Sequence, residues 1–208
     1  MLNVLGGYTT RTLTYSTHAI RAITPYVTGT DESGALQTAW PVILKETEVV
    51  VIWGADPINT NQIAWGVPDH ESYIYFKKLK EQMKKRGVKV ICIDPVLNNT
   101  SMYLGATHIH VNPTTDVALM MGICYEMMKA GVSDEKFLKR YTSGVAEFKA
   151  YLNGEAEDKI VKNAAWASKI SGVNEEDIKT LARLFGAKRT ILMCGWGPQR
   201  AHHGEQFH

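Results

Sequence analysis

The feature that most constrains the fold is a set of four short runs, rich in β-branched residues, in which apolar and polar positions do not alternate. Strands with one wet face alternate, whereas strands covered on both faces read as nearly continuous apolar runs. The chain therefore predicts a buried, mainly parallel sheet of about four or more strands. The runs are Val49–Trp53, Val88–Ile93, His108–Val111 and Thr190–Cys194.

Helical patterns separate these runs. Between the first two, Phe76, Leu79 and Met83 recur at spacings of three and four, and Gly87 is placed to end the helix. A strand, a helix and a second strand in this order form a βαβ unit with a right-handed crossover. The pattern as a whole favours a doubly wound α/β fold with helices on both faces of the sheet. Further helices are predicted within residues 15–27 and 38–45, at Val117–Lys129, Asp134–Tyr141 and Phe148–Leu152, and after Asn174.

Length and charge narrow the class of protein. A chain of 208 residues with 45% hydrophobic content can build one sizeable core. We expect a single α/β domain over residues 1–208, with residues 1–45 as a helical lead-in. The formal charge of +2 gives no reason to expect nucleic acid as a partner. The lysines and Arg86 within residues 77–86 indicate the wet face of a helix, and no apolar stretch is long enough to predict direct membrane insertion.

The three cysteines carry little functional information. Cys92, Cys124 and Cys194 lie in apolar segments without CxxC spacing. They are expected to be small buried hydrophobic residues and not a disulfide or zinc framework.

Each predicted strand ends in a short polar turn. In doubly wound sheets, ligands bind outside the carboxyl ends of the strands, so these turns should meet at one edge and hold a ligand. A nucleotide would suit them. The turns are Gly54-Ala55-Asp56-Pro57, Asp94-Pro95, Asn112 to Asp116, and Gly195 to Arg200.

Several common nucleotide and catalytic motifs are missing. The usual dinucleotide fold places G-x-G-x-x-G after the first strand, but here no second glycine follows Gly54 until Gly66. This disfavours a dehydrogenase that binds NAD in the familiar way. The sequence also lacks Walker A, HExxH and GxSxG patterns.

Single residues at the turns allow more than one interpretation. Asp116 can cap a helix, or it can accept the two parallel N–H bonds that guanine offers. Arg200 can bind a phosphate or carboxylate, or lie in solvent. Trp196, between two glycines, can stack on a flat ring or fill the core.

Outside the turns, local spacing favours structural or plain polar roles. Ser16 is placed as a helix N-cap, and nothing nearby supplies a base to make it a nucleophile. His108 and His110, like the pair His202-His203, could bind a metal, but no carboxylate or thiolate stands at a matching spacing. Polar histidines are the favoured interpretation.

Several segments together resemble one family, the bis-molybdopterin guanine dinucleotide oxidoreductases, in the branch of trimethylamine N-oxide, dimethyl sulfoxide and biotin sulfoxide reductases. They occur in the family's order and nearly fill the chain. The segments are LNVLGGY, YST, QTAWPVILKETEVVVIWGADP, PDHESY, VICIDPV, NPTTDVALMMG, AAWASKISGV and GWGPQRAHHGEQ.

The resemblance implies a molybdenum enzyme of which this chain is an interior segment. Its cofactor would be molybdenum with bis-molybdopterin guanine dinucleotide in the full-length protein, and the segment alone would lack it and be inactive. The implied reaction is two-electron removal of oxygen from an N-oxide or S-oxide, with trimethylamine N-oxide the first choice of substrate. A non-catalytic α/β nucleotide-binding or scaffold domain is the alternative.

Residue roles follow by position in the family's motifs. Ser16, from YST, would give its side-chain oxygen to molybdenum as the catalytic metal ligand, because a hard alkoxide suits a high-valent metal. Asn59 stands where the family usually has a lysine near the pterin, so the charge is lost there, while Thr60 is retained.

The remaining implied contacts are to the nucleotide and the cofactor. Ile93, Asp94 and Pro95 would hold one guanosine, with Asp94 accepting from ribose hydroxyls. Thr114 and Asp116 follow the third strand as cofactor-binding residues, and Asp116 would bind guanine. Trp196 and Arg200 match residues that line the cofactor.

The resemblance also suggests partners and a compartment. A membrane-anchored c-type cytochrome is a possible electron donor. Family habit favours the periplasm, with an upstream twin-arginine signal, and the cytoplasm is the alternative because biotin sulfoxide reductases work there.

Overall fold

In a computed structural model, residues 1–9, 16–30, 38–60 and 71–207 are described. The chain divides into two compact units. One unit consists of Met1–Gln37 together with Gln199–His208, and the other is Thr38–Pro198. Part of the PDHESY segment and the tyrosine of YST fall outside the described residues.

Unit Thr38–Pro198 is built on a four-stranded sheet with the order β3-β2-β1-β4. Its strands are β1 (Val49–Trp53), β2 (Lys89–Ile93), β3 (Thr107–Ile109) and β4 (Thr190–Cys194). Every neighbouring pair is parallel. This confirms the fold class and the strand positions expected from the β-branched runs, except that β2 and β3 each differ by one residue at the start and β3 ends two residues earlier than predicted.

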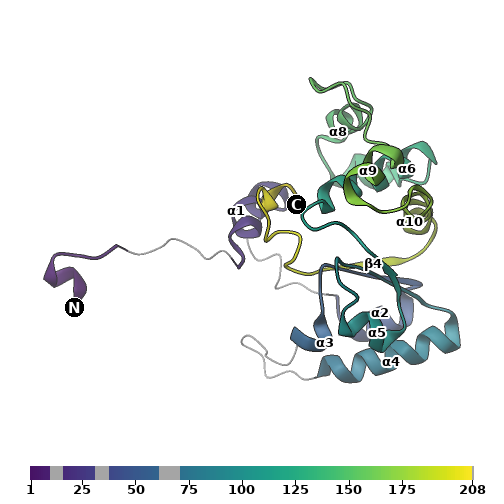
Figure 1. Ribbon diagram of the computed structural model, residues 1–208, viewed down its shortest axis with the longest axis horizontal. Helices are drawn as coiled ribbons and strands as arrows, with labels where there is room; N and C mark the ends of the chain where they lie inside the picture. Colours follow the sequence, from purple (N-terminus) through teal and green to yellow (C-terminus); the bar gives the residue numbers. More distant parts are fainter. Residues whose placement is uncertain (10–15, 31–37, 61–70, 208) are drawn as a thin grey trace. The chain divides into compact units, whose positions relative to one another are not determined.

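Helices cover both faces of this sheet (Figure 1). On one face, Val51 and Trp53 of β1 pack with residues of α6 (Asp116–Lys129), α9 (Ala164–Ser171) and α10 (Glu175–Ala187). On the other face, Val50 and Ile52 pack with α4 (Glu71–Arg86), α5 (Asn99–Leu104) and α2 (Trp40–Glu46). Successive residues of a strand point to opposite faces, so β1 contributes to both cores and is buried along its whole length.

The remaining elements are short. They are the 3₁₀ helices η1 (Leu2–Leu5) and η2 (Gly204–Phe207), and the α-helices α1 (His18–Val27), α3 (Pro57–Thr60), α7 (Glu135–Tyr141) and α8 (Val145–Leu152).

Asparagine side chains start three of the helices. Asn98 accepts from the Ser101 amide at the start of α5, Asn163 from the Trp166 amide in α9, and Asn174 from the Glu176 amide in α10. Each satisfies an amide that has no partner inside its helix. The Asn174 cap confirms the helix start predicted from the sequence.

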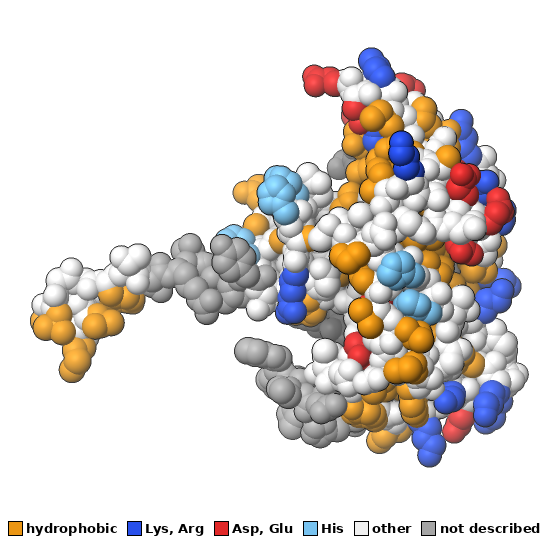
Figure 2. Space-filling model, in the orientation of Figure 1, with side chains coloured by type: hydrophobic (Ala, Val, Ile, Leu, Met, Phe, Trp, Pro, Cys, Tyr) orange, Lys and Arg blue, Asp and Glu red, His pale blue; other side chains and the backbone are white. Residues whose placement is uncertain are grey.

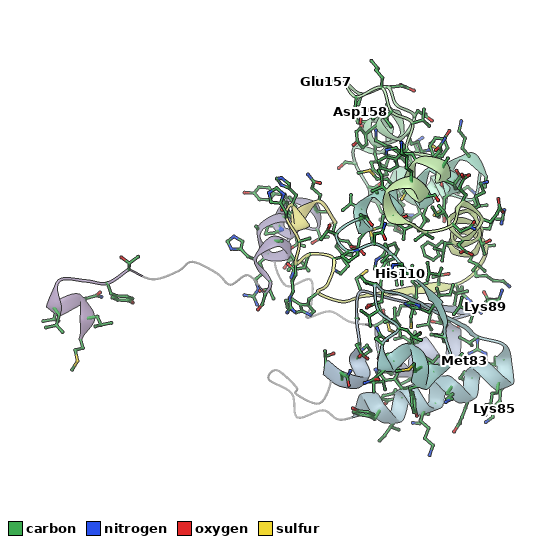
Figure 3. The ribbon with its side chains drawn as sticks, in the orientation of Figure 1. Met83, Lys85, Lys89, His110, Glu157 and Asp158 are labelled. Carbon is green, nitrogen blue, oxygen red and sulfur yellow. The ribbon has the colours of Figure 1, made fainter. Side chains whose placement is uncertain are left out.

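The lysine-rich surface of α4 is solvated, as the sequence indicates. Lys77, Lys78, Lys84 and Lys85 are exposed, and Lys and Arg side chains line the lower edge of the molecule over this helix (Figure 2). Figure 3 shows Lys85 pointing outward while Met83, from the same helix, packs toward the sheet. None of the helices in the described part of the chain is long and apolar enough to span a membrane.

The cysteines differ from one another. Cys92 is buried in the sheet, and burial raises the pKa of its thiol to about 11. Cys124 is half-buried, whereas Cys194, at the end of edge strand β4, is exposed. The expectation of burial is therefore wrong for Cys194, because β4 pairs with β1 on one side only.

Candidate functional site

The carboxyl ends of the four strands lie in register. Trp53 of β1 is paired with Ile93 of β2 and with Cys194 of β4, and Ile93 is paired with Ile109 of β3. The polar turns that follow therefore start from one edge of the sheet. This confirms that the turns start from one edge of the sheet, although Gln199 and Arg200, the last residues of the predicted fourth turn, belong to the other unit. Ligands of doubly wound sheets bind at this edge.

The turns after β1 and β4 pack against each other through glycines. The Gly195 amide donates to the Trp53 carbonyl (2.7 Å), and Gly54 adopts a left-handed conformation with φ 58°. A side chain at Gly195 would overlap the main chain of Gly54, and one at Gly54 would collide with Pro198. Glycines are required here because the two main chains come too close for a Cβ.

Two residues of the turn after β2 orient the Asp94 carboxylate by hydrogen bonds. Its Oδ1 accepts from the Val96 amide (2.9 Å) and its Oδ2 from the Asn98 amide group (3.3 Å). A carboxylate offers about four acceptor positions, so Asp94 keeps capacity for a further donor.

The two histidines of the β3 segment bind main-chain oxygens of the same turn. His108 Nε2 lies 2.9 Å from the Asp94 carbonyl oxygen, and His110 Nδ1 lies 3.0 Å from that of Pro95. Figure 3 shows His110 at the level of the sheet, between the two helical layers. Because a carbonyl only accepts, each of these ring nitrogens carries a proton, which makes it a donor and not a metal ligand.

Asn59 and Thr60 belong to a hydrogen-bonded network beside the β1 turn. The Asn59 side chain donates to Asp56 Oδ2 and accepts from Asn99 (3.0 Å). The other Asp56 oxygen accepts from the Thr100 hydroxyl (2.6 Å). Thr60 donates to the Asp56 carbonyl (3.1 Å). Asn59 thus links the β1 turn to α5, and spacing along the chain does not indicate these partners.

Asp116 is the first residue of α6 and is only 9% exposed. Its Oδ1 accepts from the indole Nε1 of Trp53 (2.7 Å). The N-cap position belongs to Thr115, which makes no side-chain cap bond, so Asp116 does not act as the helix cap. A negative charge at this end is favoured by the helix dipole. Thr114, two residues before Asp116, has φ 68°, a costly conformation for a β-branched residue that is often found at functional sites.

Trp196 is 48% exposed, which excludes the core-filling interpretation within this structure. It stands between Gly195 and Gly197, in the segment that packs on the β1 turn. A partly exposed indole flanked by small residues offers a face for stacking.

Ser16 lies in the other unit. It is exposed and precedes α1, whose N-cap is Thr17. Ser16 is therefore not the N-cap that local spacing suggested. Its main-chain carbonyl accepts from the side-chain amide of Gln199 and from Arg200 Nε (3.2 Å).

The structure thus groups the predicted residues in two sets. Ser16 and Arg200 contact each other in one unit, and the rest belong to the other unit. Sequence reasoning missed Gln199, Asn98, Asn99 and Thr100, whose partners are distant in the chain. Among the described residues, no cluster of three or more His, Cys, Asp or Glu side chains could hold a metal ion.

Comparison with known proteins identifies the family. The chain matches the family described as molybdopterin oxidoreductase over residues 1–208. The chain belongs to the molybdopterin oxidoreductase family. It is 49% identical over 208 residues to a dimethyl sulfoxide/trimethylamine N-oxide reductase of Rhodobacter capsulatus, covering 100% of this chain and 25% of that protein.

A second reductase and a solved structure are also similar to this chain. A trimethylamine-N-oxide reductase of Pasteurella multocida (strain Pm70) is 44% identical over 192 residues, covering 92% of this chain and 23% of that protein. The chain spans about a quarter of the length of these relatives. The acetylene hydratase structure from Pelobacter acetylenicus matches with a TM-score of 0.60 at 17% identity, over 78% of this chain and 20% of that one, which supports the fold alone.

Proposed function

We propose that this chain is the cofactor-binding part of a molybdenum reductase that removes oxygen from an N-oxide or S-oxide, with trimethylamine N-oxide as the first candidate. The observation that carries this proposal is the 49% identity, over the whole chain, to a dimethyl sulfoxide/trimethylamine N-oxide reductase.

The cofactor proposed is molybdenum held by bis-molybdopterin guanine dinucleotide. Three features of the described residues fit such a group. Ser16 is an exposed residue, Gln199 has a buried oxygen with no partner in the described part of the chain, and glycines allow close approach at the β1 and β4 turns. When bound, the molybdenum centre would supply two-electron oxygen-atom transfer, which protein side chains alone cannot perform.

In this proposal Ser16 gives its side-chain oxygen to the metal. No cluster of protein ligands is needed, since the pterin would supply the other ligands, and this agrees with the described residues. Arg200 donates to the Ser16 carbonyl through Nε, and in this proposal its planar guanidinium also contacts a phosphate or a pterin oxygen, the groups that such a donor suits.

The turns would hold the nucleotide. Asp94, oriented by Val96 and Asn98, would accept from ribose hydroxyls, with Ile93 and Pro95 packing beside the guanosine. Asp116 would accept from guanine through the oxygen that Trp53 does not use. Thr114, Thr60 and Trp196 would complete the contacts. Asn59 has both amide atoms engaged within the protein, so its proposed contact to the cofactor is the weakest of the set.

A role in anaerobic respiration in the periplasm, with a c-type cytochrome as electron donor, is proposed from the resemblance of the chain to these reductases alone.

The experiment is metal analysis of the protein that contains this sequence, expressed in a host that makes the molybdenum cofactor. We expect about one molybdenum per chain, as for a single catalytic centre with an open coordination position. Ser16→Ala should abolish reduction of trimethylamine N-oxide without changing the circular dichroism spectrum, while Thr17→Ala serves as the matched control. A protein that folds but carries neither molybdenum nor pterin would favour the non-catalytic scaffold.

A further inference from the structure

Gln199 is a buried polar residue whose side chain is hydrogen-bonded to the main chain of Ser16. It is 4% exposed, and its side-chain amide donates to the Ser16 carbonyl, 183 residues away in sequence. Gly204 lies so close to the Gln199 carbonyl that a side chain there would overlap it, which fixes the Gln199 main chain. The orientation of the amide is fixed as well, because only its NH₂ group can donate to a carbonyl.

The Ser16 carbonyl receives two donors from this turn. Arg200 Nε donates to the same oxygen at 3.2 Å. A carbonyl oxygen has two lone pairs, so these two bonds saturate it. Gln199 and Arg200 therefore hold Ser16 by its main chain, and neither bond uses the side-chain hydroxyl of this exposed residue.

The side-chain oxygen of Gln199 makes no corresponding bond within the described part of the chain. Its Oε1 is buried and has no hydrogen-bond partner in the described part of the chain. Buried acceptors without a partner are rare in folded proteins, and each calls for an explanation such as a ligand that is absent. The NH₂ group cannot be exchanged with this oxygen, since Ser16 requires the donor.

We propose that Gln199 is the positioning residue of the Ser16 ligand: its NH₂ group orients Ser16 through the carbonyl, and its Oε1 accepts an N–H donor of the bound pterin. A pterin carries N–H donors on its ring and on its exocyclic amine, and it has the donor type that the buried oxygen lacks. This inference rests on the proposed function. Gln199 itself would touch no substrate.

The test uses three variants of the cofactor-loaded enzyme that contains this sequence. Gln199→Met keeps the size and removes both polar atoms, whereas Gln199→Glu keeps the shape and makes donation depend on protonation. Gln206→Met is the matched control, because Gln206 lies in the same unit and is exposed. The readouts are molybdenum and pterin content per chain and the Mo(V) electron paramagnetic resonance spectrum, which reports the ligands of the metal.

We expect Gln199→Met to lower activity by about 10- to 100-fold, the usual effect of losing a partner that orients a metal ligand. Its Mo(V) spectrum should shift toward that of Ser16→Ala. Gln199→Glu should match the wild-type spectrum at acid pH, where the buried carboxyl is protonated and can donate to Ser16, and depart from it as the pH rises. Gln206→Met should resemble the wild type throughout.

Two results would overturn the inference. One is a Gln199→Met enzyme with wild-type metal content and an unchanged Mo(V) spectrum, even if it melts at a lower temperature. If Gln199→Met does not fold, the isosteric Gln199→Glu decides: a wild-type spectrum at a pH where infrared absorption shows the new carboxyl to be ionised is the second such result. Failure of the proposed function is distinguishable, because the wild-type protein itself would then contain no molybdenum.

Discussion

The indole of Trp53 donates a hydrogen bond to Asp116 across 2.7 Å, and this joins the last residue of β1 to the first residue of α6. Both residues are buried, and 63 positions separate them in the chain. The bond places a carboxylate at the carboxyl edge of the sheet and at a helix N-terminus, where negative charge is favoured. The same residue pair therefore belongs to the core and to the candidate nucleotide site.

Trp53→Phe should lower the free energy of unfolding by about 1–3 kcal/mol, because it leaves a buried acceptor without its donor. Urea unfolding followed by circular dichroism measures the change. In an Asp116→Leu background the same substitution should cost less, since no carboxylate is left unsatisfied, and the difference gives the coupling energy. Equal costs in both backgrounds would show that the bond contributes nothing beyond the packing of the indole.

Asp116→Asn separates the two roles of the carboxylate. The amide oxygen can still accept from Trp53, so the stability should change by less than about 1 kcal/mol. The new NH₂ group, however, would face the donors of guanine, and two donors cannot pair. We expect the loaded enzyme to retain much less cofactor, measured as pterin per chain after gel filtration. Asp134→Asn, at an exposed helix cap, is the control. Equal cofactor retention in both variants would contradict the proposal that Asp116 binds guanine.

The sequence predicts the parallel sheet well because its signal is local. A run such as Val49–Trp53, apolar on both faces, is typical of a parallel sheet covered on both sides, and the carboxyl ends of neighbouring parallel strands lie at one edge. The short helices α5 and α9 were missed, since six and eight residues carry little periodicity and their starts depend on Asn98 and Asn163.

The candidate site was only partly predictable. The turns follow from strand order, but side-chain pairing across the fold does not. The residues around Asp56 do not indicate that it accepts from Thr100, and the bond between Gln199 and Ser16 depends on tertiary structure. The exposure of Trp196 and the position of Asp116 inside α6 also depend on packing that spacing cannot show.

Gly195→Ala should destabilise the protein by about 1–3 kcal/mol or more, the usual cost of overpacking, because the new methyl group would overlap the main chain of Gly54. Gly105→Ala is the control. Gly105 has φ 63° with open space around it, so that variant measures backbone strain alone, about 1 kcal/mol. Thermal unfolding of both variants provides the comparison. An alanine at position 195 that costs no more than one at position 105 would mean that the β1 and β4 turns separate easily.

The buried thiol of Cys92 should make stability fall at alkaline pH. Burial raises its pKa from 9.0 to about 11 in the folded protein, so the unfolded chain loses this proton first. Between these two values the unfolded state binds fewer protons, and stability falls by up to about 1.4 kcal/mol per pH unit. The Cys92→Ala variant has no thiol at this position, so this loss of stability should be absent from it. Urea unfolding at about pH 8 and about pH 10 should show the wild type losing more stability than the variant across this range, and equal losses would contradict the assignment.

A buried cation lies outside the candidate site, between α8 and α9. Lys162 is 1% exposed and its ammonium contacts Asp158 Oδ2 (2.6 Å) and the Ile160 carbonyl (2.7 Å). The rings of Tyr151 and Trp166 lie 4.5 and 5.5 Å from the same nitrogen. Figure 3 shows Asp158 at the outer end of this region. The bond from Lys162 holds the pKa of Asp158 below its usual range.

Removing the negative partner of a buried charge costs more than removing the charge itself, because the ammonium stays desolvated and keeps only neutral partners. Asp158→Asn should therefore destabilise the protein more than Lys162→Met, which replaces the cation by an apolar chain of similar length. The Lys162→Met change should cost less than about 2 kcal/mol, since the aromatic rings still pack on the new side chain. Lys169→Met, at an exposed position of α9, is the matched control. Unfolding in guanidinium chloride gives the free energy of unfolding of the three variants. A larger loss for Lys162→Met than for Asp158→Asn would mean that the ammonium is a net source of stability.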